Sequence, residues 1–219
     1  MDLKFVIAFI GRQGSSYLEG LLHSHPDAQC HGELLAYSGI GDRLFEHVES
    51  HVHTSGKSAS GFKLALQHIT AYPEIVEFMK IHGYKVIRLY RDNKLDQYIS
   101  MRLAQINSSW RSDFGEYTVH TLSIDPDDLE SEITLFREND LILEKGLAGF
   151  PQIQLSYEEL TKPNGHTVCL DFLGLSHCPL NSPFRRQRRL TRRETIQNYD
   201  SLVERFAGTE IARYFSPEG

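Results

Sequence analysis

Residues 5–17 read FVIAFIGRQGSSY, a run of six apolar residues followed by a short turn with glycine, arginine and serine. Such a run is typical of a central strand in a parallel sheet. After the turn, Leu18, Leu21 and Leu22 recur with the spacing of one helix face. The pattern therefore predicts a buried strand, a tight turn and a helix.

The turn has the composition of an anion site. Backbone N–H groups at a helix N-terminus have no intrahelical acceptor, and Gly14 has no Cβ to keep a ligand away from them. Arg12 and two hydroxyls add a charge and further donors. The alternative is an ordinary turn in which Ser15 or Ser16 only caps the helix.

Three known motifs are excluded. The Gly56-Lys57-Ser58 triplet has His51 where a Walker A loop needs its first glycine, and no apolar strand precedes it. The Gly39-Ile40-Gly41 triplet has Leu44 at the third glycine position of a dinucleotide fingerprint. A G-x-S-x-G nucleophile elbow is also missing around the serines of the turn.

The composition indicates one globular domain over residues 1–219. With 219 residues, 40% apolar and 11% aromatic, the chain can bury one sizeable core. Its formal net charge of −6 argues against general affinity for nucleic acids or membranes, so a basic site has to be local.

One such local site is a run of arginines close to the C-terminus. A run of like charge is usually a solvated loop, which is the first interpretation. Because this run lies inside an acidic chain, the second interpretation is that it binds an anion. The run consists of Arg185, Arg186, Arg188, Arg189, Arg192 and Arg193.

The cysteines indicate a reducing compartment, and the lengths of the apolar segments argue against a membrane span. Cys30, Cys169 and Cys178 are odd in number and include no C-x-x-C pair, which predicts free thiols used in packing. No apolar segment approaches the roughly 20 residues of a membrane span, and the N-terminal run lacks a cleavage pattern. We expect a protein without a membrane span that stays in the cytoplasm.

Strand and helix patterns alternate along the chain, which predicts an α/β fold with a parallel sheet. The pattern predicts strands at 5–10, 61–66, 86–90 and 153–157, and helices at 16–24, 72–82, 93–108, 125–147, 167–173 and 195–206.

A second candidate phosphate site follows the strand at 86–90. Arg91 ends this strand and Ser100 lies nine residues later in the next helix. In open α/β sheets ligands bind at the carboxyl edge, where the two side chains could converge on a phosphate. Taken alone the pattern is weak, and a surface arginine with a helical serine is the alternative.

Both stretches resemble motifs of the PAPS-dependent sulfotransferases, where PAPS is 3′-phosphoadenosine 5′-phosphosulfate. The segment Gly11–Tyr17, with Ser24-His25-Pro26 and Gly32-Glu33, is similar to the 5′-phosphosulfate motif, and most similar to the bacterial carbohydrate branch of trehalose and nodulation-factor type. The segment Arg91–Ser100, with the following Ala104 and Trp110, resembles the 3′-phosphate motif of that branch.

Later segments extend this resemblance over nearly the whole chain in the same order. They are Tyr157–Leu160, Phe172–Leu175 and Ile196–Asp200. One departure is Asp92, which stands where a second basic residue is frequent in the family. We therefore expect weaker binding of the 3′-phosphate.

The resemblance implies a P-loop-like three-layer α/β fold, with helices on both sides of a central parallel sheet. It also implies an enzyme that moves the sulfuryl group of PAPS to a hydroxyl acceptor, a carbohydrate, without a metal. The product nucleotide is then 3′-phosphoadenosine 5′-phosphate (PAP). The resemblance is consistent with a homodimer.

The resemblance implies nucleotide-binding roles by motif position. The 5′-phosphosulfate would be held by Arg12 and the amides of Gln13, Gly14, Ser15, Ser16 and Tyr17. The 3′-phosphate would be held by Arg91 and Ser100. Arg185, Arg186 and Gln187 sit where relatives close a basic loop over the nucleotide.

Sulfuryl transfer, like phosphoryl transfer, depends on positioning and on stabilising charge on the leaving phosphate. Arg12 and Lys63 are the candidates for that stabilisation, and the family has a lysine in a similar G-x-K-L segment. An inward ammonium in a strand is costly to bury without an anion partner. The alternative for Lys63 is an outward, solvated side chain.

The acceptor hydroxyl has to lose a proton as it attacks. Glu33 is the first candidate for the general base, because relatives of the trehalose branch use the glutamate of the G-E pair in this role. His68 is the rival candidate, since other members of the superfamily use a histidine after a similar lysine.

Two other classes of function remain open. His25, Cys30 and His31 could ligate zinc, although their spacing matches no zinc motif. A protein that binds the nucleotide without turnover is the second alternative.

The acceptor pocket is expected in the loops 34–60 and 108–124, where aromatic, arginine and histidine side chains would suit a sugar, a phenol or a peptide tyrosine. These side chains are Tyr37, His51, His53, Trp110, Arg111, Phe114 and Tyr117.

Overall fold

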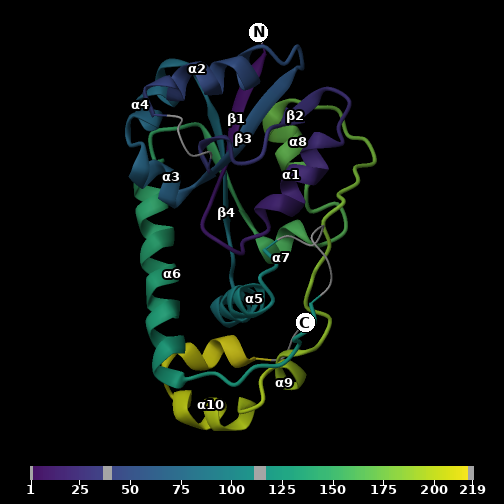
Figure 1. Cartoon of the computed structure of the whole chain (residues 1–219). Helices are drawn as coiled ribbons and strands as arrows, with labels where there is room; N and C mark the ends of the chain where they lie inside the picture. Colours follow the sequence, from purple (N-terminus) through teal and green to yellow (C-terminus); the bar gives the residue numbers. More distant parts are fainter. Residues whose placement is uncertain (1, 37–40, 111–116, 217–219) are drawn as a thin grey trace. The chain divides into compact units, whose positions relative to one another are not determined.

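The computed structural model describes residues 2–36, 41–110 and 117–216 (Figure 1). Its centre is a sheet of parallel strands in the order β2-β3-β1-β4-β5. The strands are β1 (Leu3–Phe9), β2 (Ala28–Cys30), β3 (Ala59–Ala65), β4 (Lys85–Tyr90) and β5 (Gln152–Ser156). The predicted α/β fold with a central parallel sheet flanked by helices is confirmed.

The chain divides into two compact units. The first unit comprises residues 1–90 and 139–183 and contains the sheet, and the second comprises residues 91–138 and 184–219. The boundary at the end of β4 assigns Arg91 and Ser100 to the second unit, and the turn at 10–14 to the first. The single domain over 1–219 stays a prediction.

In the first unit, helices cover both faces of the sheet, with α1 and α8 on one side and α2, α3 and α4 on the other (Figure 1). The helical elements of this unit are α1 (Ser15–His23), η1 (Leu34–Ala36), η2 (Gly41–Arg43), α2 (Leu44–Val48), η3 (Glu49–His53), α3 (Leu66–Ala71), α4 (Glu74–Ile81), α7 (Tyr157–Leu160) and α8 (Thr167–Leu173).

The alternation of side chains along β1 builds two hydrophobic cores, because successive residues of a strand point to opposite faces. Phe5 and Ile7 pack with the leucines of α1 and with α8. Val6 and Ala8 pack with α2, α4 and the last turns of α6 (Pro126–Gly146). The strand that the apolar run predicts is therefore buried on both faces, as a central strand has to be.

The second unit consists of helices and connecting segments. Its elements are α5 (Lys94–Ile106), the part of α6 before residue 139, α9 (Arg192–Thr195), α10 (Tyr199–Phe206) and η5 (Glu210–Phe215). The start of α6 is capped by Asp125, whose carboxylate accepts the N–H groups of Asp127 (2.9 Å) and Asp128 (3.2 Å). The helix predicted over 125–147 is thus confirmed, with the Asp125 side chain capping its start.

The helix predicted over 195–206 is confirmed only over Tyr199–Phe206 (α10), because Ile196 leaves the helix. Its backbone is extended and forms a parallel bridge with Leu122, and the Gln197 N–H donates to the Leu122 carbonyl (3.0 Å). The chain therefore forms two short helices, α9 and α10, on either side of this bridge.

Other predicted boundaries also differ. The helix predicted over 72–82 begins at Glu74, after Pro73 as its N-cap, and α3 precedes it as a separate helix. Tyr157 begins α7 and does not end the strand before it, because Ser156 caps this helix with a capping box. Strand β2 was not predicted from the sequence.

The three cysteines are free, as predicted, with Cys30 and Cys169 buried. Burial raises the pKa of each of these two thiols to about 12, so both are suited to packing and not to nucleophilic chemistry. Across the described residues, no helix is both long enough and apolar enough to cross a membrane.

Candidate active site

The turn after β1 has the backbone of a tight loop that leads into a helix. Gly14 is the N-cap of α1 with a φ of 86°, and Arg12 also has a positive φ of 69°. Left-handed backbone at a residue other than glycine costs energy and is frequent at functional sites. Gly14 also passes close to Tyr157, where an added Cβ would lie 2.8 Å from a ring carbon.

The interpretation of Ser15 or Ser16 as the N-cap is wrong, because both are the first residues of α1. The first intrahelical bond runs from the Leu18 N–H to the Gly14 carbonyl (3.1 Å). The amides of Ser15, Ser16 and Tyr17 therefore precede the intrahelical ladder, in the position from which helix starts bind anions.

Gln13 fixes the shape of this loop from inside. Its side chain is fully buried, and the side-chain oxygen Oε1 accepts the Ile10 N–H at 2.9 Å. Its amide nitrogen donates to a carboxylate oxygen of Asp140 at 2.8 Å. The predicted contribution of Gln13 to an anion site is that of its backbone amide. Its side chain instead forms hydrogen bonds within the protein that hold the loop in place.

Lys63 on β3 points inward and lies at the centre of a charged cluster. Its ammonium donates to the Ser16 hydroxyl (3.0 Å) and forms ion pairs with Glu33 (3.1 Å) and Glu19 (3.3 Å). The side chain of Lys63 is only 4% exposed. The alternative of an outward, solvated lysine is wrong, and the anions that compensate its burial are two carboxylates of the protein itself.

Glu19 belongs to this cluster and was missed from the sequence. It lies on α1 one turn after Ser16, with its side chain 14% exposed. Residues three and four apart share a helix face, so Ser16 identifies the face on which Glu19 lies. That spacing was the available signal, but only the partner on β3 gives Glu19 its significance.

Sheet pairing brings Glu33 to Lys63. The ladder between β2 and β3 continues past the last residue of β2, with the Lys63 N–H donating to the Gly32 carbonyl at 2.7 Å. Gly32 has a φ of 67° and turns the chain so that Glu33 follows beside Lys63. The G-E pair thus places a carboxylate at the end of the sheet where β1 and β3 finish.

His68 lies on the other side of Glu33. Its Nε2 is 3.8 Å from a Glu33 oxygen, and its Nδ1 accepts the Ala65 N–H at 3.3 Å. The proton of a neutral ring therefore sits on Nε2, the nitrogen that faces Glu33. Burial lowers the pKa of His68, with Glu33 acting against this and Lys63 adding to it. A neutral His68 in this tautomer presents a donor to the cluster, whereas Glu33 presents an acceptor.

The second unit contains a buried ionic network centred on Asp96 of α5. Arg188 donates to this carboxylate at 2.7 Å, and Arg192 binds both of its oxygens at 3.1 and 3.0 Å. All three side chains are buried. Two members of the predicted arginine run therefore fasten the C-terminal segment to α5, and Arg193 forms an exposed pair with Asp200.

Arg91 belongs to the same charged neighbourhood. Burial by itself would raise the pKa of Asp96, but the hydrogen bond from Arg192 and the charges of Arg188 and Arg91 hold it below its usual value. Arg91 is buried, and Ser100 lies one turn after Asp96 on α5. In this part of the second unit, several guanidinium groups act on the Asp96 carboxylate.

The remaining predicted nucleotide contacts lie in the segment before α9. Arg185 and Arg186 are exposed, as is Arg189. Gln187 is half-buried, and its side chain accepts from the Tyr117 hydroxyl (3.1 Å) and donates to the Ser109 hydroxyl (3.3 Å). The structure describes these groups within the second unit only.

The predicted zinc set does not come together in the described part of the chain. His25 uses Nε2 for the Ser176 carbonyl (2.9 Å) and Nδ1 for the Asp27 N–H (3.0 Å). The donor atoms of His25, Cys30 and His31 do not form a group within ligating distance.

Of the side chains expected around the acceptor, Tyr37, Arg111 and Phe114 lie outside the described residues. His53 forms a hydrogen bond with the hydroxyl of Tyr84 (3.0 Å), and Tyr84 is the residue that precedes β4. It therefore lies at the amino edge of the sheet, opposite the edge where Glu33 and Lys63 meet. Trp110 is 53% exposed and Tyr117 is buried.

Comparison with known proteins supports the fold. No protein-family model and no curated protein matches the chain. Among solved structures, a sulfotransferase from Alicyclobacillus acidocaldarius is similar, with a TM-score of 0.52 and 16% sequence identity over 94% of this chain and 92% of that chain. The chain therefore has a sulfotransferase fold, and at this identity the likeness extends to the fold alone.

Proposed function

We propose that this protein is a sulfotransferase that moves the sulfuryl group of PAPS to a hydroxyl acceptor, with a carbohydrate as the expected acceptor class. The observation that carries the proposal is the cluster of Lys63, Ser16 and Glu33. It combines a buried cation, a helix start and a partly exposed carboxylate at the carboxyl edge of a parallel sheet, the edge at which open α/β sheets bind ligands.

The donor nucleotide is proposed to bind through its anionic groups. The amides at residues 13–17, together with Arg12, suit the 5′-phosphosulfate, because a helix start and a guanidinium both favour anions. The 3′-phosphate is proposed to bind Arg91 and Ser100, with Arg185, Arg186 and Gln187 closing over the nucleotide. These assignments extend the motif resemblance to residues of both units.

The transfer step forms a bond between the acceptor oxygen and sulfur, and breaks the bond between sulfur and the bridging oxygen of the 5′-phosphate. The electron pair of the broken bond stays on PAP as phosphate charge. Lys63 and Arg12 are proposed to stabilise that charge, because fixed cations act strongly in a site shielded from water. Glu33 is proposed to take the proton of the acceptor hydroxyl.

Glu33 and Lys63 suit this pair of roles because each is already oriented by the other. The ion pair at 3.1 Å holds the Glu33 carboxylate with one oxygen on Lys63, while its side chain is 32% exposed and thus open to an acceptor. The arriving phosphosulfate would give Lys63 a further anion, beside Glu19 and Glu33, in exchange for part of its contact with Glu33.

The experiment that tests this function is the transfer reaction. The purified protein is incubated with PAPS and a panel of sugars and phenols, and PAP and the sulfated product are measured by mass spectrometry. PAP that forms only with a sulfated acceptor supports the proposal. Tight PAP binding without transfer to any acceptor would favour the non-catalytic alternative.

The 3′-phosphate role predicts a selective loss in Arg91→Gln. A charge-assisted hydrogen bond contributes about 1.5–3 kcal/mol, so PAP should bind about 10–100-fold more weakly while AMP, which lacks the 3′-phosphate, changes little. Calorimetric titration of both nucleotides measures the difference. The matched control is Arg193→Gln, because Arg193 already pairs with Asp200. Equal losses for PAP and AMP would refute this role of Arg91.

A further inference from the structure

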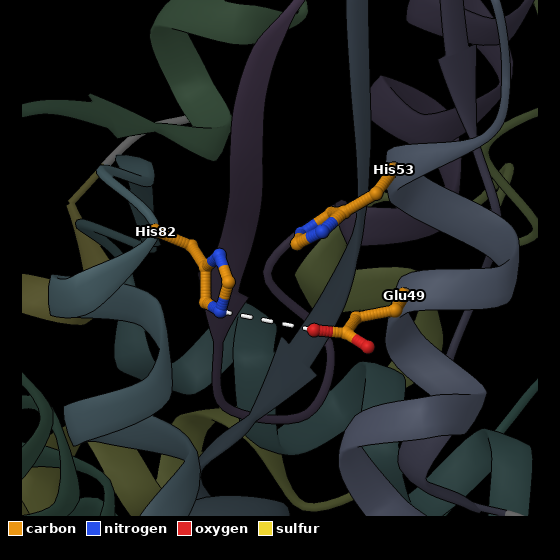
Figure 2. Close-up of side chains that lie close together, drawn as sticks. All are labelled: Glu49, His53 and His82. Carbon is orange, nitrogen blue, oxygen red and sulfur yellow. Dashed lines mark ion pairs between the residues drawn. The ribbon is translucent and has the colours of Figure 1, made fainter.

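A group of three potential metal ligands lies in the first unit, away from the proposed sulfotransferase site. Figure 2 shows the rings of His53 and His82 and the carboxylate of Glu49 directed toward one another. Within the described residues, one ligand atom from each of these three side chains lies within 4.8 Å of the other two. The Nε2 of His82 and a carboxylate oxygen of Glu49 are 3.8 Å apart.

We propose that Glu49, His53 and His82 bind a divalent transition-metal ion, with zinc as the best match. Two imidazoles and one carboxylate are a known three-ligand set for zinc, with water in the fourth position. Tetrahedral zinc with bonds of about 2.0–2.2 Å needs ligand atoms roughly 3.3 Å apart. Small side-chain rotations therefore convert the present group into a site.

The local fold places these side chains. Glu49 and His53 are the first and last residues of η3, a π-helical turn that continues α2, and a four-residue spacing puts them on one face. Such π turns occur often at functional sites. His82 is the C-cap of α4, so the third ligand comes from a different helix.

The end of α4 is fixed by its capping motif. Gly83 has a φ of 65°, its N–H donates to the Lys80 carbonyl (3.1 Å), and the Tyr84 N–H donates to the Met79 carbonyl (3.0 Å). These two bonds make a Schellman motif. It holds His82 at a defined place and brings Tyr84 back toward η3.

Tyr84 is positioned to act as an outer partner of the site. Its hydroxyl lies 3.0 Å from Nε2 of His53, which leaves Nδ1 of that ring to bind the ion. Histidine ligands usually donate their second N–H to such a partner, which fixes the ring orientation. The apolar ring of Phe78 packs near both histidines. Its centroid lies 4.4 Å from that of the His82 ring and 5.9 Å from that of the His53 ring.

The position of the group sets the proposed ion apart from the proposed sulfotransferase site. His82 and Tyr84 directly precede β4, so the site lies at the amino edge of the sheet. Val52 of η3 and Met79 of α4 belong to the same hydrophobic core. A bound ion would join these two segments on that core, far along the strands from Lys63.

The test is calorimetric titration with zinc chloride of the tag-free full chain and of variants that each lack one proposed ligand. We expect one equivalent of zinc to bind. Loss of an outer partner alone costs about 10–100-fold in affinity, so Tyr84→Phe should fall in this range, and Glu49→Gln, His53→Gln and His82→Gln should lose at least as much.

Two controls make the result decisive. His47→Gln and His51→Gln change neighbouring histidines outside the group and should leave zinc binding unchanged. In the wild-type protein, zinc should raise Tm and a chelator should reverse the rise, a readout that does not depend on folding of a variant. Absence of zinc binding, or binding that only the control variants weaken, would overturn the proposal.

Discussion

Replacing Glu33 by glutamine is expected to slow sulfuryl transfer by about 10²–10⁴-fold, the usual contribution of a general base. Glutamine keeps the size of the side chain but cannot take the proton of the acceptor. PAP should bind the variant at least as tightly as the wild-type protein, because Lys63 loses one of its two internal carboxylate partners. The measurement is the rate of PAP formation with the acceptor found in the panel.

The matched control for Glu33→Gln is His68→Gln. His68 directs a ring N–H toward Glu33 and uses its other nitrogen for the Ala65 N–H, so its loss should change the rate far less. A full transfer rate in Glu33→Gln together with a large loss in His68→Gln would contradict the assignment and make His68 the base.

Asp96→Asn is expected to destabilise the protein by about 3–5 kcal/mol, because removing one partner of a buried ionic network leaves charges without compensation. The variant keeps the shape of the side chain but removes the carboxylate that forms ion pairs with the buried Arg188 and Arg192. Urea denaturation at neutral pH measures the difference. The matched control is Asp200→Asn, which removes an exposed partner of Arg193 and should change stability far less.

The same network predicts a dependence on acid. The pKa of Asp96 is lower in the folded protein than the value of about 3.9 in an unfolded chain, so its contribution is complete above that value and is lost as the pH falls through the folded pKa. The wild-type protein should therefore lose more stability in acid than Asp96→Asn. Parallel acid sensitivity of the two proteins, or equal stability at neutral pH, would count against the network.

Local patterns in the sequence predicted the central part of the fold. The apolar run before Gly11 and the helical spacing of leucines after it are local signals, and the structure places β1 and α1 there. The same is true of the capped start of α6 at Asp125. Strand β2 has only three residues, too few for a recognisable alternation, and its place comes from pairing with β3.

The candidate site was only partly predictable, since its partners are distant in sequence. Motif position singled out Lys63 and Glu33, but Glu19 reads as an ordinary polar position of a helix until sheet pairing brings Lys63 to it. The contact between Arg192 and Asp96 spans 96 residues of chain. No local pattern shows that part of the arginine run serves to hold α5 and not to hold a ligand.

The central claim is that the chain binds a 3′-phosphorylated sulfonucleotide, and calorimetric titration with PAP, beside AMP and ATP, tests it without knowledge of the acceptor. The account predicts micromolar or tighter binding of PAP, with AMP weaker by at least about tenfold because it lacks the 3′-phosphate. Equal binding of all three nucleotides, preference for ATP, or no binding of PAP would contradict it.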